Sequence, residues 1–265
     1  MSETSSPKAT GRPLIFISND DSISAPGLHR LVDYVKDFGD VIVVAPEEPH
    51  SGMSSAFTVS DALRINELDD YNGARMFTVN GTPVDCVKLG LYAVTPRKPD
   101  IMLAGINHGS NSGNSIIYSG TMGAVLEGCM EGIPSVGFSL LHHSIAADFS
   151  LSAPFVSEIV KKVLDEGLPH GICLNVNIPA KVVPVGVRTC RAARGHWSDG
   201  YSRYLDPQGN PFYMLNGRFI NEDKDATDTD EYWLARNYIS VVPVTPEMTY
   251  TPAIKDMARL FDTQE

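Results

Sequence analysis

The chain has 265 residues, 43% of them hydrophobic and 20% charged, a length and composition that fit one large globular domain and exclude a mainly disordered protein. Its formal net charge is −11 and it contains no basic run, which argues against a surface for a nucleic-acid polymer. No segment reaches transmembrane length, and four widely spaced cysteines without a Cys-x-x-Cys pair are typical of reduced thiols. We therefore expect a cytoplasmic protein with no membrane partner and with a disordered leader over residues 1–12.

Residues 13–190 alternate short apolar segments with helical ones, which predicts an α/β fold with a Rossmann-like, doubly wound, mostly parallel sheet. Strands are expected near 14–18, 41–46, 75–79, 101–107, 135–140 and 171–178, and helices near 26–37, 83–95, 121–132 and 152–166. Thr82 and Ser152 stand shortly before a proline at two of the helix starts and are candidate N-caps. The alternation from Phe57 to Leu68 indicates a further excursion into β-structure.

Residues 191–265 lack this rhythm and are expected to form a C-terminal β-hairpin and helix extension used in oligomerisation. The sequence predicts a hairpin-like segment over Pro211 to Ile220, a strand over Tyr238 to Val244 and a helix near 252–262. The acidic stretch Asn221 to Glu231 is expected to be a solvated loop, because it follows no ligand spacing. Many aromatic residues with little core of their own favour contact with another subunit, so we expect a homodimer or homotetramer.

Two adjacent carboxylates, Asp20 and Asp21, directly follow the apolar strand predicted at 14–18. The carboxyl ends of parallel strands line the ligand crevice of an open α/β sheet, and two acids placed there need a cationic partner. Asn107 and the loop from Pro46 to Ser55 follow two other predicted strands and should lie at the same edge. Their oxygen donors suit Mg²⁺ or Mn²⁺ better than Zn²⁺. For any one of these residues alone, a helix cap or a turn is the alternative.

The segment from Gly109 to Ala124 is small and polar before it runs into an apolar helix. Such a loop can hold phosphate with its backbone N–H groups, its hydroxyls and the positive end of the helix. Ser119 and Thr121 would serve equally well as ordinary N-caps. The segment is neither a P-loop nor Gly-x-Gly-x-x-Gly, and no Gly-x-Ser-x-Gly elbow occurs in the chain. A hard metal, a phosphate-sized anion and water together indicate phosphoester hydrolysis.

Several ordered motifs resemble the SurE family of survival-protein nucleotidases over about residues 13–245. They are Asn19-Asp20-Asp21, Ala45-Pro46 to Ser51-Gly52, Asn80-Gly81-Thr82-Pro83-Val84-Asp85, Gly105-Ile106-Asn107-x-Gly109-x-Asn111-x-Gly113 and Tyr118-Ser119-Gly120-Thr121. The resemblance implies a metal-dependent phosphohydrolase that releases phosphate from nucleoside monophosphates. The implied activity is that of a 5′-nucleotidase, with 3′-nucleotidase and exopolyphosphatase activity as open possibilities.

Carried over by position, the resemblance implies one divalent ion, Mg²⁺ or Mn²⁺, bound by Asp20, Asp21, Ser51 and Asn107. The phosphate would be held by Asn111, Ser119, Gly120 and Thr121. Because no histidine is placed well enough in the sequence to be named as the base, we expect one of the two aspartates to orient or deprotonate the attacking water.

Two positions depart from the family pattern. Ser22 stands where a glycine commonly comes after the two acids, so either the turn differs or the serine side chain caps the segment after it. His50 stands where the family often carries a fixed cation, which affects substrate contacts and their pH dependence.

Other classes remain as alternatives at this stage. A receiver-type regulator also has an acidic pair after its first strand, but it needs a phosphoacceptor aspartate after a later strand, where this chain has Asn80-Gly81. A noncatalytic nucleotide-binding module is the second alternative, and release of inorganic phosphate distinguishes it from an enzyme.

Overall fold

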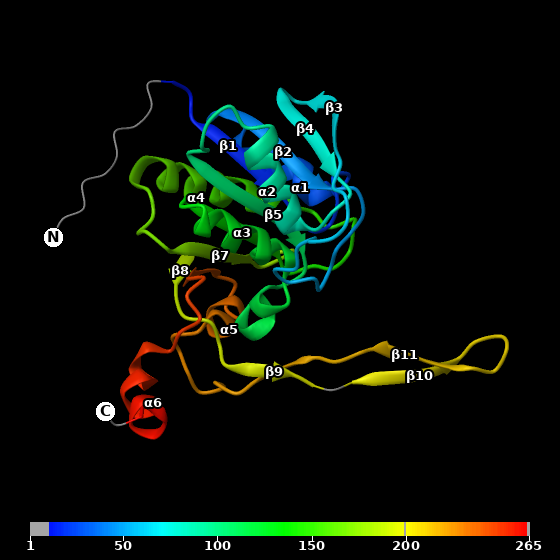
Figure 1. Cartoon of the computed structure of the whole chain (residues 1–265), viewed down its shortest axis with the longest axis vertical. Helices are drawn as coiled ribbons and strands as arrows, with labels where there is room; N and C mark the ends of the chain where they lie inside the picture. Colours follow the sequence, from blue (N-terminus) through cyan, green and yellow to red (C-terminus); the bar gives the residue numbers. More distant parts are fainter. Residues whose placement is uncertain (1–10, 199, 264–265) are drawn as a thin grey trace.

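A nine-stranded sheet forms the centre of the computed structural model, which describes residues 11–198 and 200–263 (Figure 1). The strand order is β3-β4-β2-β1-β5-β6-β7-β13-β8. The six strands from β4 to β7 in this order are parallel, while β3 and β13 run antiparallel to β4 and β7. Residues 1–10 of the predicted leader lie outside the described residues.

The strands and helices follow the chain in an alternating order up to β7. The strands of the sheet are β1 (Leu14–Ser18), β2 (Asp40–Pro46), β3 (Ile65–Tyr71), β4 (Ala74–Val79), β5 (Ile101–His108), β6 (Ser135–Leu140), β7 (Cys173–Ile178), β8 (Val187–Thr189) and β13 (Ile239–Val244). The helices of this part are α1 (Pro26–Val35), α2 (Pro83–Ala93), α3 (Gly120–Met130) and α4 (Ala153–Glu166), with short 3₁₀ turns η1 (Gly113–Ile117) and η2 (Ser150–Ser152).

Helices cover both faces of the sheet, which explains why its central strands are apolar on both sides. In β1 all five residues are buried. One core contains Leu28 of α1 and Val160 of α4, and the other contains Val87 of α2 and Val125 of α3. The predicted fold class, a Rossmann-like doubly wound sheet, is confirmed.

The cap of α2 is as predicted, whereas the cap of α4 is not. Thr82 and Asp85 form a capping box in which each side chain accepts from the other residue's backbone N–H. Ser152 precedes α4, but its hydroxyl donates to the Phe149 carbonyl at 2.6 Å and caps no N–H, so that prediction is wrong. The β-excursion expected from Phe57 to Leu68 is confirmed only at its end, where β3 begins at Ile65.

The C-terminal part contains β9 (Gly195–Trp197), β10 (Tyr201–Leu205), β11 (Pro211–Leu215), β12 (Phe219–Asn221), α5 (Asp230–Leu234), η3 (Thr251–Ala253) and α6 (Ile254–Phe261). Strands β10 and β11 form a hairpin that extends away from the central sheet (Figure 1). Helix α6 also lies away from this sheet (Figure 1). The segment predicted as a hairpin over Pro211 to Ile220 supplies β11 and β12 instead, and β12 pairs with β9. Strand β13 returns to the central sheet, so the division at residue 190 stays a prediction. None of the described helices is both long and apolar enough to span a bilayer.

Candidate metal and phosphate site

Asp21 and Asn107 meet at the carboxyl edge of the sheet, where the chain order reverses on either side of β1. Ser18 of β1 pairs with Ala104 of β5, and Asp21 and Asn107 each lie three residues beyond that pair. The His108 backbone N–H donates to Asp21 Oδ2 at 3.1 Å. The two predicted ligand positions are therefore brought together by strand register.

Asn107 follows an irregular stretch of β5. The peptide between Gly105 and Ile106 is cis, and the β5–β6 register shifts between Ala104 and Asn107. Gly105 has φ +115°, and a Cβ there would lie 2.3 Å from the Phe138 carbonyl oxygen, so only glycine fits. The Asn107 Nδ2 donates to the Gly109 carbonyl at 3.0 Å, which leaves its Oδ1 as the atom that could bind a cation.

Asp20 lies against the first turn of α3. The Thr121 hydroxyl donates to Asp20 Oδ1, and the Thr121 backbone N–H also bonds this carboxylate. A Cβ on Gly120 would lie 2.7 Å from the Asp20 Cβ, so a side chain here would displace the aspartate. The Asp20 carbonyl accepts from the His50 N–H at 2.7 Å.

The two carboxylates lie in an environment that disfavours their charge. Burial, followed by the charge of Asp21, raises the pKa of Asp20 from its ordinary value of 3.8 to about 6, against hydrogen bonds from Thr121. Burial also raises the pKa of Asp21, opposed by the backbone N–H and the ring of His108. Among the described residues, no lysine or arginine forms an ion pair with either aspartate.

A divalent cation fits this donor set. No cluster of three or more His, Cys, Asp or Glu side chains suited to a metal occurs in the described part of the chain, so a cation here would rely on two carboxylates and neutral oxygens. Next to Asp20, the Asn19 Oδ1 is buried and has no hydrogen-bond partner. Two neighbouring carboxylates that no lysine or arginine of the described residues neutralises are an arrangement that a hard cation would neutralise.

Ser51 lies in the loop after β2, and its side chain is exposed. The residue before it, His50, is bonded to Asp20, and the Ser54 hydroxyl donates to the Ile117 carbonyl at 2.6 Å. These contacts fix the loop between the aspartates and the segment that leads into α3. Ser51 as a ligand stays a prediction.

Ser22 adopts φ +92°, a left-handed conformation that glycine tolerates better than serine. The Ser22 carbonyl accepts from Asn19 Nδ2 at 2.8 Å, and the Ser22 hydroxyl lies 3.1 Å from that of Ser24. The turn after the two acids therefore keeps the shape that calls for glycine, with serine in a strained position.

The backbone of the 109–113 loop does not cradle an anion as expected. Its N–H groups bond inward, from Gly109 to Leu140 O (2.9 Å), Asn111 to Asn177 Oδ1 (2.8 Å), Ser112 to Ser110 Oγ (3.1 Å) and Gly113 to Asp230 Oδ2 (2.7 Å). These four N–H groups have partners inside the protein, so an anion held by the segment predicted over 109–124 would depend on its hydroxyls and on the start of its helix. The side-chain amide of Asn111 donates to Ser139 Oγ at 2.8 Å.

The start of α3 remains the predicted anion-binding element. Ser119 is its N-cap, and its Oγ accepts from the Met122 N–H at 3.1 Å. Within the first turn of α3 the Thr121 N–H faces the Asp20 carboxylate and the Met122 N–H is capped by Ser119, so an anion here would bind at the Gly120 N–H. The helix dipole adds a favourable field for an anion. The Ser119–Thr121 turn directly adjoins Asp20, so a phosphate held there would lie beside the predicted cation.

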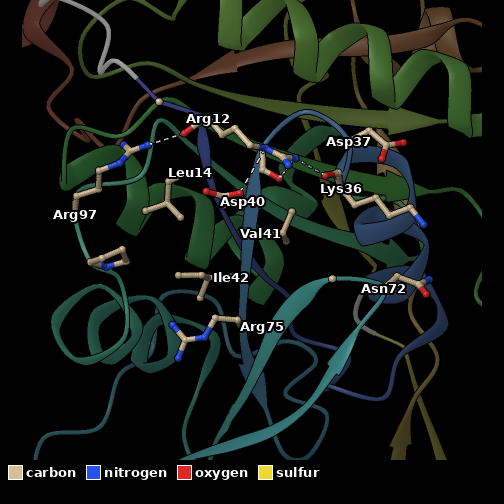
Figure 2. A pocket seen from close by; sticks show the side chains of 14 residues that line it. Arg12, Leu14, Lys36, Asp37, Asp40, Val41, Ile42, Asn72, Arg75 and Arg97 are labelled. Atoms are coloured by element: carbon tan, nitrogen blue, oxygen red, sulfur yellow. Dashed lines mark hydrogen bonds and ion pairs between the residues drawn. The ribbon is translucent and has the colours of Figure 1, made fainter.

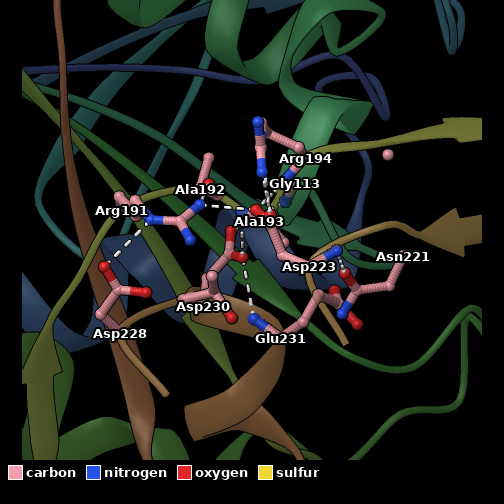
Figure 3. A network of polar contacts seen from close by, with 12 residues as sticks. Gly113, Arg191, Ala192, Ala193, Arg194, Asn221, Asp223, Asp228, Asp230 and Glu231 are labelled. Carbon is pink, nitrogen blue, oxygen red and sulfur yellow. Dashed lines mark hydrogen bonds and ion pairs between the residues drawn. The ribbon is translucent and has the colours of Figure 1, made fainter. Parts of the chain in front are cut away.

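Sequence reasoning missed the buried residues whose side chains form hydrogen bonds with the backbone of the 109–113 loop. Asn175 and Asn177, both fully buried in β7, bond its backbone; Asn175 Nδ2 donates to the Asn111 carbonyl at 2.8 Å. Asp230, also fully buried, accepts N–H groups from Gly113, Ala193 and Glu231 at 2.7–2.8 Å (Figure 3). Polar residues alternating inside the apolar strand β7 were the available signal.

The acidic stretch over 221–231 is only in part the expected solvated loop, because Glu222, Lys224 and Asp225 are exposed whereas Asp223 and Asp230 are buried. Asp223 is buried and binds both Arg191 (2.6 Å) and Arg194 (2.9 Å), which hold the pKa of its carboxyl well below the usual range (Figure 3). The prediction is therefore wrong for these two carboxylates: Asp223 pairs with two arginines of the same C-terminal part, and Asp230 joins that part to the core through the Gly113 N–H.

A cavity of about 950 Å³ lies at the opposite, amino-terminal edge of the sheet (Figure 2). Its arginines already have acidic partners: Arg12 with Asp40, Arg75 with Glu67 and Arg97 with Asp100. None of the predicted site residues lines this cavity. The candidate site therefore lies at the carboxyl edge, where ligands of such sheets usually bind.

The fold and this edge define a Rossmann-like α/β protein whose oxygen donors suit a hard cation next to an anion. The chain belongs to the survival protein SurE family: the family profile described as "Survival protein SurE" matches residues 15–199. The resemblance predicted from the ordered motifs is thus confirmed.

Individual relatives are similar to this chain over almost its whole length. The protein named 5′-nucleotidase SurE of Christiangramia forsetii is 46% identical over 252 residues, which cover 93% of this chain and 96% of that protein. The protein of the same name from Phocaeicola vulgatus is 44% identical and covers 90% of this chain and 93% of its own. The crystal structure of the SurE protein from Aquifex aeolicus matches with a TM-score of 0.80 at 34% identity, covering 94% of this chain and 99% of that one.

Proposed function

We propose that this chain is a 5′-nucleotidase that hydrolyses nucleoside monophosphates to a nucleoside and inorganic phosphate with the help of one divalent cation, Mg²⁺ or Mn²⁺. Family membership and the name shared by relatives at 40–46% identity support the reaction. The observation that carries the proposal is the meeting of Asp20, Asp21 and the start of α3 at one edge of the sheet, with no lysine or arginine paired with either carboxylate among the described residues.

We assign the roles of the residues from the oxygen atoms that could bind a cation and from the N–H and hydroxyl groups that could bind a phosphate. Asp20, Asp21, Ser51 and Asn107 would hold the cation, and Asn111 with the Ser119–Thr121 turn would hold the phosphate. A bound divalent cation supplies Lewis-acid chemistry, polarising a phosphoryl oxygen and lowering the pKa of a water molecule.

The chain itself would contribute position and charge. The start of α3 would orient the phosphate and stabilise the charge on its equatorial oxygens. An aspartate of the pair would orient the attacking water or accept its proton. The 109–113 loop, bonded inward through its backbone, would keep Asn107 and Asn111 in place.

We also propose that the C-terminal region forms a homodimer or homotetramer. The β10–β11 hairpin exposes Tyr201, Tyr213 and Leu215 at 61–69% of their surface, and no residue of α6 is buried. Apolar surface of this kind is typical of an interface. The four cysteines are free thiols, three of them buried, which supports a reducing compartment such as the cytoplasm.

The test is a phosphate-release panel. Nucleoside 5′- and 3′-monophosphates and a short polyphosphate are each incubated with Mg²⁺, Mn²⁺ or a chelator. We expect release from 5′-monophosphates with either metal and none with the chelator, and the panel also decides the 3′ and polyphosphate activities. Binding of nucleotides without any release would favour a noncatalytic module and overturn the proposal.

A further inference from the structure

We infer that Thr121 is a positioning residue of the cation site, whose hydroxyl fixes Oδ1 of Asp20 and leaves Oδ2 available to the cation. This inference rests on the proposed function, and it gives Thr121 a task different from the phosphate contact implied by the family resemblance.

The hydrogen-bonding capacity of the hydroxyl supports this assignment. Thr121 is fully buried and Asp20 is 4% exposed, so no solvent competes for the contact between them. A hydroxyl has one proton to donate, and that of Thr121 goes to Asp20 Oδ1. The same proton is therefore not available to a phosphate oxygen.

The surroundings allow Asp20 little other freedom. Gly120 leaves room for its side chain, since a Cβ there would lie 2.9 Å from Oδ2, and the His50 N–H holds its carbonyl. The hydroxyl of Thr121 thus selects one orientation of a carboxylate whose backbone is already fixed. Groups that orient a metal ligand in this way typically contribute ~10–100-fold to metal affinity.

The experiment compares Mn²⁺ binding to the full-length wild type and to Thr121→Val and Thr121→Ser by titration calorimetry, without phosphate or nucleotide. Valine keeps the shape and removes the donor, whereas serine keeps the donor. Thr78→Val is the matched control, because Thr78 is also buried and its hydroxyl donates to the Ala45 carbonyl at 3.3 Å, outside the site. Thermal unfolding in chelator checks that each variant is folded.

We expect Thr121→Val to weaken Mn²⁺ binding at least tenfold, with Thr121→Ser and Thr78→Val within about threefold of the wild type. Wild-type affinity in folded Thr121→Val, with weaker inhibition by inorganic phosphate, would assign the hydroxyl to phosphate and overturn the inference. So would a tenfold loss in Thr121→Ser, which remains decisive if the valine variant does not fold. A wild type that binds no Mn²⁺ would overturn the proposed cation site as well.

Discussion

Replacing Asp20 by asparagine should stabilise the metal-free protein while abolishing its function. The pKa of Asp20 in the folded protein, about 6, is above its ordinary value of 3.8. As pH rises from about 4 to about 6, Asp20 loses its proton in the unfolded chain before it does so in the folded protein, so the free energy of unfolding falls. Above about pH 7 the whole of this loss of stability is present. The substituted asparagine would have no charge to bury and would still offer an oxygen to the Thr121 hydroxyl.

The size of the effect can be worked out from the two pKa values. One pKa step is worth about 1.4 kcal/mol, so the interval from 3.8 to about 6 corresponds to about 3 kcal/mol at pH 7. For a chain of this size the melting temperature should rise by roughly 5–10 °C. The gain should become small near pH 4 and vanish at about pH 3, where the wild-type carboxyl is protonated in both states.

The assay is thermal unfolding of the wild type and Asp20→Asn in chelator at pH 4, 5.5 and 7.5, with Mn²⁺ titrations and phosphate release at pH 7.5. The control is Asp37→Asn, which removes the same charge from an exposed position and should change stability by less than about 0.5 kcal/mol. We expect stability to rise in Asp20→Asn as Mn²⁺ binding and turnover fall.

A metal-free Asp20→Asn protein that is less stable than the wild type at pH 7.5 would refute the reasoning about buried charge. Unchanged Mn²⁺ affinity and turnover in the folded variant would instead remove Asp20 from the metal site.

Four further outcomes are expected. Mn²⁺ affinity of the wild type should fall roughly tenfold per pH unit below about pH 6, because a proton competes for Asp20, and a flat calorimetric profile from pH 7 to 5 would contradict this. Ser22→Gly should raise stability by about 1 kcal/mol in chemical denaturation, since glycine adopts φ +92° freely, whereas a loss would show that the serine contacts matter more. Asp230→Ala should cost roughly 2–4 kcal/mol in the same measurement, because two buried N–H groups and one part-buried N–H group lose their acceptor, and wild-type stability would argue against the observed contacts. Replacing 201–215 by a short Gly/Ser link should leave the core folded and lower the mass seen by light scattering, unless the hairpin takes no part in assembly.

The mechanism has a separate isotope test. In ¹⁸O-labelled water, a single turnover should place the label directly in the released phosphate, because water is the expected nucleophile. A phosphoenzyme trapped by acid quench would point to a covalent intermediate instead.

Much of the core could be predicted because its signals are local. A strand buried on both faces is a continuous apolar run, and a strand end is the place where polar residues reappear, so Asp20, Asp21 and Asn107 could be assigned to one edge of a parallel sheet. The errors also have local causes. A run of acidic residues is usually solvated, and its local pattern does not show that Asp223 is buried and pairs with Arg191 and Arg194.

Hydrogen-bond partners far apart in sequence were decided by the tertiary structure alone. Thr121 and Asp20 are 101 residues apart, and Gly113 and Asp230 are 117 apart. A small polar loop looks the same in sequence whether its N–H groups face a ligand or the protein interior. Here the N–H groups face the interior because β7 and α5 place Asn177 and Asp230 next to the loop. A buried N–H needs an acceptor, and only the packed structure shows which residue supplies it.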